Sequence, residues 1–218
     1  MLHSAEFVSR QAPASTAAVP EDLHYSLTLD GAPAGSARWT VGPEKNAVVI
    51  RRETFFSGPL GQGRKLEVSR LEGGRPAAFS ESGDGVGRGH FEVSSDRRAG
   101  MLSVRLGRDE ASAALIQDMI DPLTLIQTVR LADPEVRWLR LPMVGGTVLA
   151  TRLPDATVRA PWGDTPTRVW YVRPGVNVIY VEADAPHRPL RLTQETDVGV
   201  MELTLTSSSS AARMPRPA

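Results

Sequence analysis

The residues of this 218-residue chain that could do chemistry are few and widely separated. Cysteine is absent, which excludes disulfides, thiolate metal sites and a cysteine nucleophile. His90 and Glu92 stand two residues apart, so on a strand they would share a face and could together contact a metal ion. One such pair is common by chance, and the other histidines lie far from it in the sequence: His3, His24 and His187. We therefore expect no metal site.

Two glycine-rich stretches are superficially similar to nucleotide-binding loops. In "GPLGQGRK" at 58–65, Gly63 precedes Arg64 and Lys65, where a phosphate-binding loop requires Lys and then Ser or Thr. This stretch also leads into a strand pattern, whereas a phosphate-binding loop opens a helix. The stretch "GDGVGRG" at 83–89 lacks the dinucleotide-binding spacing and is typical of a hairpin loop.

No serine stands in a G-x-S-x-G elbow, and no nucleophile and base occur in a recognisable pattern. We therefore expect no catalytic residue, no cofactor and no enzymatic activity. A hydrolase whose catalytic residues come together from distant parts of the chain is the enzymatic alternative.

The aromatic residues are more suggestive. Ordinary core packing explains their concentration on segments with strand patterns, and a concave apolar pocket is the functional alternative. Such a pocket would need covered faces and a lid. The tryptophan and tyrosine residues concerned are Trp39, Trp138, Trp162, Trp170, Tyr25, Tyr171 and Tyr180.

These side chains must be positioned by strands, because apolar and polar residues alternate with a period of two along much of the chain. In "DLHYSLTLD" the side chains of Leu23, Tyr25 and Leu27 face one way, and "SARWTV" repeats the pattern after the glycine-containing turn "GAPAG". Similar short runs recur along the chain, with "GTVLATRL" and "TVRA" as separate strands. The runs "RVWYV" and "VNVIYV" are apolar on both faces, so we expect both sides of the sheet to be covered there. The pattern predicts a mainly β fold: a single strongly curved antiparallel sheet or open half-barrel.

The stretch "QDMIDPLTLIQTVRLADP" at 117–134 is the one helical pattern in the chain. Asp121 can cap a helix and Pro122 suits its first position. Leu125, Ile126 and Val129 then share an apolar face. The opposite face is predicted to carry Thr124, Gln127 and Thr128. A helix of about ten residues is unstable alone in water, so we expect one short helix at about 121–131 packed on the sheet.

Composition indicates one globular β domain without a charged partner. The hydrophobic content is 41% and the net charge is zero. Arginines occur among equal numbers of acids, as at Arg51–Arg52, Arg97–Arg98 and Arg137/Arg140, and fit solvated strand faces. We therefore expect no nucleic-acid binding. No apolar run approaches the roughly 18–20 residues of a membrane span.

The domain organisation follows from where the alternation begins and ends. Residues 1–21 are rich in Ala, Ser, Thr and Pro from residue 10 onward and are predicted to be a flexible leader. Residues 22–206 are predicted to form the single β domain. The tail at 207–218, "SSSSAARMPRPA", is of low complexity and is predicted to be disordered.

Three segments occur in an order that resembles the bacterial domain-of-unknown-function family 3108. They are "YSLTLDGAPAG", "DPLTLIQTVR" and "RPLRLTQETDVGVMELTL", and the likeness covers nearly all of 22–206. Members of that family resemble exported envelope proteins with a curved antiparallel sheet, and the likeness extends to half-barrels that carry lipoproteins or other lipids. The family has no established activity. The resemblance implies a first hairpin with Tyr25, Gly31 and Gly35, a helix with Asp121, Pro122 and Arg130, and a late strand with Pro189, Leu190 and Arg191.

We therefore expect a non-enzymatic protein that binds a lipid-like or apolar small molecule in a sheet groove, or an envelope protein partner. A closed β scaffold or protein-interaction module without a ligand is the alternative. The resemblance favours the periplasm or cell envelope. The N-terminal residues, which show no basic region followed by an apolar one, favour the cytoplasm instead. The predicted groove residues are Leu125, Ile126, Val129, Trp138, Trp170 and Tyr180.

Overall fold

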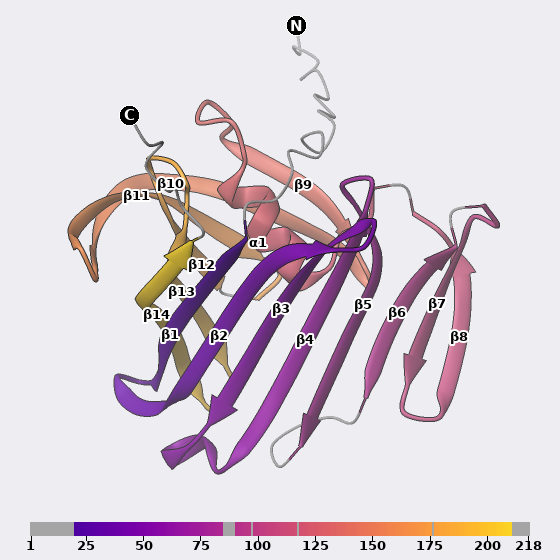
Figure 1. Ribbon diagram of the computed structural model, residues 1–218, viewed down its shortest axis with the longest axis horizontal. Coiled ribbons are helices and arrows are strands. Elements are labelled where there is room, and N and C mark those ends of the chain that lie inside the picture. The colour runs from indigo at the N-terminus through magenta and orange to yellow at the C-terminus, as the bar shows by residue number, and fades with distance from the viewer. Residues whose placement is uncertain (1–19, 85–89, 97, 117, 176, 211–218) are drawn as a thin grey trace, which may run out of the picture.

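A computed structural model describes residues 20–84, 90–96, 98–116, 118–175 and 177–210 (Figure 1). These residues form fourteen strands, the α-helix α1 and the short 3-10 helix η1. The elements are β1 (Glu21–Leu29), β2 (Ala32–Glu44), β3 (Ala47–Phe56), η1 (Gly58–Leu60), β4 (Gly63–Glu72), β5 (Arg75–Asp84), β6 (Phe91–Asp96), β7 (Met101–Leu106), β8 (Asp109–Ala114), α1 (Pro122–Arg130), β9 (Trp138–Met143), β10 (Gly146–Ala160), β11 (Gly163–Arg173), β12 (Asn177–Glu182), β13 (Pro189–Thr196) and β14 (Gly199–Ser210).

All fourteen strands belong to one antiparallel sheet in the order β8-β7-β6-β5-β4-β3-β2-β1-β14-β13-β12-β11-β10-β9. Each strand pairs with the next one along the chain, except that β8 and β9 are not paired and form the two edges of the sheet. Near the centre of the sheet, β1 pairs with β14. The sheet therefore stays open. This confirms the predicted open half-barrel with one helix. The alternative of a closed β scaffold is wrong on one point, since the sheet is not closed.

The sheet curves around α1, so that the helix lies between β3–β5 and β9–β11 (Figure 1). The helix contacts β3, β4 and β12. The helix therefore lies on the concave face, where its apolar side chains and those of the sheet exclude water together. Leu23, Tyr25, Trp39 and Trp170 are among the side chains buried there.

Three predicted boundaries are wrong: one inside β10, one at the start of the tail, and the end of the leader, since Glu21 is the first residue of β1 and pairs with β2 and β14. The strands predicted for "GTVLATRL" and "TVRA" form one strand, β10, because the register with β11 shifts between Leu153 and Ala156. Pro154 lies in that bulge, where a strand needs no hydrogen-bond donor. The serines 207–210, predicted to belong to a disordered tail, extend β14 because they pair with residues 21–24 of β1.

The remaining parts of the predicted leader and tail, at 1–19 and 211–218, lie outside the described residues, as do 85–89 of the glycine-rich loop. In the first hairpin, Gly31 occupies the turn with a φ of 82°. Gly35 instead lies within β2 with a φ of 140°. A Cβ on Gly35 would lie 1.9 Å from the carbonyl oxygen of Phe55, so the close approach of β3 requires glycine there.

The first turn of α1 is tied to the sheet through Asp121. Its carboxylate accepts hydrogen bonds from the backbone N–H groups of Leu123 and Thr124 at 2.9 and 3.0 Å, and from the Ser69 hydroxyl at 2.7 Å. The Thr124 hydroxyl accepts from the Asp121 N–H at 2.8 Å, which completes a capping box. The predicted cap is confirmed.

One predicted face of the helix is wrong. Leu125, Ile126 and Val129 are buried as predicted, but Thr124 is buried too, because its hydroxyl is used in the cap. Leu123 is also fully buried. The helix thus packs over more than one apolar stripe, since it lies inside a curved sheet and not on a flat one.

The last turn of α1 is held by two arginines. The Arg130 guanidinium forms a two-hydrogen-bond pair with Glu21 of β1 at 2.7 and 2.8 Å, and it also donates to the backbone oxygens of Pro186 and His187. Arg168 of β11 donates to the backbone oxygens of Arg130 and Ala132, each at 2.8 Å. These bonds satisfy helix-end carbonyls and place positive charge at the negative end of the helix dipole.

Truncation of Leu123 should measure how firmly the helix is packed. Leu123→Ala should lower the free energy of unfolding by about 2–5 kcal/mol, because it leaves a cavity under α1. Leu131→Ala is the matched control: Leu131 follows the helix and is 53% exposed, so its truncation should cost less than about 0.5 kcal/mol. Urea unfolding compares the two, and equal losses would contradict the described packing.

Candidate functional site

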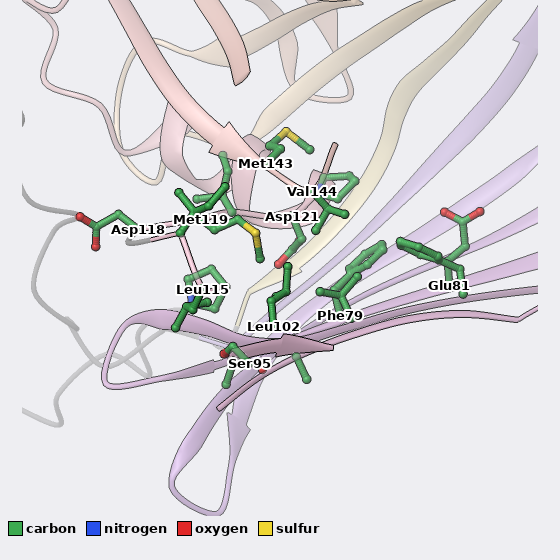
Figure 2. A pocket seen from close by; sticks show the side chains of 18 residues that line it. Phe79, Glu81, Ser95, Leu102, Leu115, Asp118, Met119, Asp121, Met143 and Val144 are labelled. Atoms are coloured by element: carbon green, nitrogen blue, oxygen red, sulfur yellow. Dashed lines mark hydrogen bonds between the residues drawn. The ribbon is translucent and has the colours of Figure 1, made fainter. Parts of the chain in front are cut away.

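The concave face holds two adjoining cavities. The smaller one, of about 160 Å³, lies between strands β5–β7 and the chain segment that precedes α1 (Figure 2). In Figure 2, Phe79 and Leu102 rise from the sheet towards Met119, Met143 and Val144 on the opposite side. Its lining is mostly apolar. A cavity of about 150 Å³ with such a lining can bind benzene.

The wall opposite the sheet is formed by a segment that returns from the β8 edge. Its Ile120 N–H donates to the Pro142 oxygen of β9 at 2.8 Å, and Ile120 forms an isolated parallel bridge with Met143. The segment before the helix is thereby fixed to the other edge strand. This bridge positions Met119 over the sheet.

The larger cavity, of about 340 Å³, lies next to the smaller one: Glu81, Pro122 and Met143 line both. Its volume falls within the range of small-molecule sites. Leu125 and Ile126 of α1 form one part of its wall. Its other apolar walls come from the central and later strands, through Leu27, Phe56, Val148, Val172, Ile179, Leu192, Met201 and Leu203.

A row of four charged side chains crosses the floor of the larger cavity on β3, β4 and β5. The Arg52 guanidinium contacts both carboxylate oxygens of Glu67, at 2.6 and 2.8 Å. The Lys65 ammonium lies 3.4 Å from Glu67 and 3.0 Å from Glu81. The order is therefore Arg52, Glu67, Lys65, Glu81, with alternating charges that sum to zero. We call these four residues the charged row.

Burial and charge act in opposite directions on the pKa values of Arg52 and Glu67, which form the inner pair of the charged row. Burial alone would raise the pKa of Glu67, but the charge and hydrogen bonds of Arg52, with help from Lys65, outweigh it and hold that pKa below its usual value. Burial would likewise lower the pKa of Arg52, and the Glu67 carboxylate raises it above its usual value. Both groups are therefore charged at neutral pH.

Asp121 behaves differently. Burial raises the pKa of this helix-capping carboxyl above its usual value, although the hydrogen bonds from Ser69, Thr124 and Leu123 act in the lowering direction. Its oxygens are used by the cap and by Ser69. Asp121 thus has a structural role at the border of the smaller cavity.

The predicted groove residues do not all come together. Leu125 and Ile126 line the larger cavity, whereas Val129 and Trp170 are fully buried in the core beside it. Trp170 pairs with Ile179, a cavity residue, so it faces the concave side. Tyr180 follows Ile179 directly and therefore lies on the opposite, convex face.

Trp138 is also on the convex face. Trp138 pairs with Thr151, and Thr151 pairs with Tyr171, so these three side chains share one face of the sheet. Tyr171 directly follows the inward-facing Trp170, so that face is the convex one. The Trp138 side chain is 51% exposed. Two of the six predicted residues thus lie outside the concave site, because "RVWYV" and "VNVIYV" are apolar on both faces and the pattern gives no signal for the direction of each aromatic.

The charged row was missed, and the prediction that Arg52 lies on a solvated face is wrong. Its side chain is 19% exposed and that of Glu67 is 2%. Arg52 is two residues from the buried Ile50, so period two alone would have turned it inwards. On β4 the pattern is inverted, since Glu67 and Ser69 are buried while Leu66 and Val68 are only partly so.

The residues considered for a metal lie apart from both cavities. His90 Nε2 is 3.6 Å from a Glu92 carboxylate oxygen, and both side chains are more than two-fifths exposed. Within the described parts of the chain, no group of three or more metal-ligating side chains occurs.

The fold and its cavities define a class: an open, half-barrel β protein with two cavities on its concave face. Among solved structures, the chain is similar to a β-barrel-like protein of the domain of unknown function DUF1849 from Brucella abortus, with a TM-score of 0.62 and 10% sequence identity. The match covers 91% of this chain and 100% of that one. At this identity the likeness shows the fold alone.

No protein-family model and no curated protein matches the sequence. The resemblance to family 3108 therefore stays a prediction. Over the described residues, α1 is the single α-helix, and no helix has the length and apolar character needed to cross a membrane.

Replacing Glu67 should reveal the inner ion pair through its pH dependence. Because the folded state depresses the pKa of Glu67 below its usual 4.5, the stabilisation is present above that value and is lost as the pH falls through the lower folded pKa. Glu67→Gln should cost about 3–5 kcal/mol at pH 7, since it leaves Arg52 without its carboxylate. The difference from the unmodified protein should shrink as the pH falls below 4.5 and the Glu67 carboxylate becomes protonated.

Urea unfolding at a series of pH values measures this difference. Asp121 titrates with the opposite sign, but it is present in both proteins and so cancels. Glu72→Gln is the matched control, because Glu72 ends the same strand and its side chain is 55% exposed. A difference for Glu67→Gln that stays constant from neutral to acidic pH would show that the pair does not set the pKa of Glu67.

Proposed function

We propose that this protein is a non-enzymatic binding protein of the cell envelope, which takes up an amphiphilic, lipid-like ligand on the concave face of its sheet. The observation that supports this most is the pair of adjoining cavities. One is lined mainly by apolar side chains, and the other combines apolar walls with the charged row.

The dimensions favour an amphiphile over a wholly apolar molecule. Burying an apolar chain contributes about 0.8 kcal/mol for each CH₂ group. The smaller cavity is of benzene size, which suits a chain segment of about six carbons. A wholly apolar ligand that continued into the larger cavity would desolvate the charged row without any compensating contact. A ligand with a polar head can end there.

The charged row also favours binding over catalysis. Arg52 engages both oxygens of Glu67, and Lys65 links Glu67 to Glu81. A general acid or base needs a proton that can be exchanged near neutral pH. The depressed pKa of Glu67 removes that possibility for the best-buried carboxylate of the row. The proposal of a non-enzymatic role rests on this arrangement.

Filling the smaller cavity tests the binding site. Val144 lies in the turn after β9, is 37% exposed and points into the smaller cavity (Figure 2). Val144→Trp should therefore occupy the cavity from a position that tolerates a large side chain. Binding of a neutral apolar dye, N-phenyl-1-naphthylamine, should weaken about tenfold or more, because contacts worth about two CH₂ groups are lost.

Val198→Trp is the matched control, since Val198 lies in an exposed turn between β13 and β14 and lines neither cavity. Its dye affinity should equal that of the unmodified protein. Equal affinity for both tryptophan variants, each with an unchanged melting temperature, would contradict binding in the smaller cavity.

The envelope location rests on the resemblance to family 3108 and on the lipid-like character of the proposed ligand. Fractionation of the native host, with an antibody against this chain, should find the protein in the periplasmic or membrane-associated fraction. Recovery of the full-length chain from the cytosol alone would overturn this part of the proposal and leave the binding site itself untouched.

A further inference from the structure

The chemical nature of the ligand's polar end can be deduced from the outer half of the charged row. Lys65 and Glu81 form its outer half, with their charged groups 3.0 Å apart. Their side chains are 31% and 28% exposed, and both residues line the larger cavity. They therefore present one positive and one negative group side by side to whatever enters.

The inner half of the row is not free to bind. Both oxygens of Glu67 are engaged by Arg52, and the Glu67 side chain is 2% exposed. Removing either partner from such a buried pair would leave an uncompensated charge. Lys65 and Glu81 keep spare capacity instead, because an ammonium has three donors and a carboxylate accepts at two oxygens.

A ligand head with a single charge fits this wall poorly. An anion that pairs with Lys65 adds a second negative charge beside Glu81, and that charge has no partner in the partly desolvated cavity. A cation that pairs with Glu81 likewise adds an unmatched positive charge beside Lys65. A head that carries both charges can exchange partners with the pair and leave no charge unmatched.

On the basis of the proposed function, we propose that the ligand is a zwitterionic amphiphile, with an oxyanion and an ammonium group a few bonds apart in its head. The oxyanion pairs with Lys65 and the ammonium with Glu81. No other charged side chain lines the larger cavity in the described parts of the chain, apart from the closed pair of Arg52 and Glu67. A phosphoethanolamine-type head has this chemistry.

The apolar chain of the same ligand has a place directly beside the head. Glu81 lines both cavities, so it lies at their junction. Figure 2 shows Glu81 at one end of the smaller cavity, beside Phe79. A head bound at Lys65 and Glu81 therefore positions the start of a chain at the entrance to the apolar lining of Phe79, Phe91, Val93 and Leu102.

Head-group selectivity tests this inference. Titration calorimetry below the micelle concentration should compare lysophosphatidylethanolamine, lysophosphatidylglycerol and an alkylamine of equal chain length. The zwitterion should bind at least about tenfold tighter than either singly charged probe, as expected when a charge-assisted hydrogen bond is kept instead of lost. Free O-phosphoethanolamine, which has the head without the chain, should bind far more weakly.

Variants of the pair should change the order of affinities. Glu81→Gln should weaken the zwitterion about tenfold and spare the anionic lipid, and Lys65→Met should spare the alkylamine instead. The double exchange K65E/E81K restores an ion pair and should regain the preference for the zwitterion. Glu53→Gln is the control, because Glu53 of β3 pairs with Arg64 of β4 on the convex side and lines neither cavity.

Each outcome has one meaning. Equal affinity of the unmodified protein for all three chain-bearing probes would overturn the zwitterion and leave the proposed function standing. Absence of binding by every chain-bearing probe would overturn the proposed function as well. Binding of O-phosphoethanolamine as tight as that of the lysolipid would show that the ligand is a free zwitterion and not a lipid.

Discussion

The pairing of β1 with β14 is the constraint on which the rest of the structure depends. It joins the two ends of the domain at the centre of the sheet, and it thereby moves the middle of the chain to the two edges, β8 and β9. The segment between these edges, residues 115–137, must then cross from one to the other. The concave face is where it crosses, and α1 forms there.

Polar contacts fix this crossing at both ends of the helix, and apolar burial alone would not. Asp121 is tied to Ser69 on β4, and Arg130 is tied to Glu21 on β1. A helix of nine residues gains little stability from its own hydrogen bonds. Because the two anchors lie on different strands, they fix both ends of the helix against the sheet. The space left beside it becomes the two cavities: the smaller lies towards β5–β7, and the larger lies towards the central and later strands.

Much of this fold could be predicted from the sequence because its elements are local. Period-two alternation identifies most strands, and Asp121 followed by Pro122 identifies the start of the helix. The site was far less predictable. The inward-facing charged row pairs residues whose strands meet only in the folded sheet, and on β4 the polar side chains, not Leu66 and Val68, are the buried ones. The predicted aromatics failed for a related reason. Where both faces of a strand are covered, as around Trp170 and Tyr180, composition does not reveal which side a residue faces.

The order of the strands also has a consequence for how the chain acquires its shape. From β1 to β8 and again from β9 to β14, each strand pairs with the next along the chain, so each half can form through short loop closures. The β1–β14 pair instead joins residues almost the whole domain apart, as in Leu23 with Ser208. Its loop-closure cost is the largest in the sheet. We therefore expect two independently formed meanders that dock late, with the bare edges of β1 and β14 as the surfaces most prone to mispair with another chain until they meet.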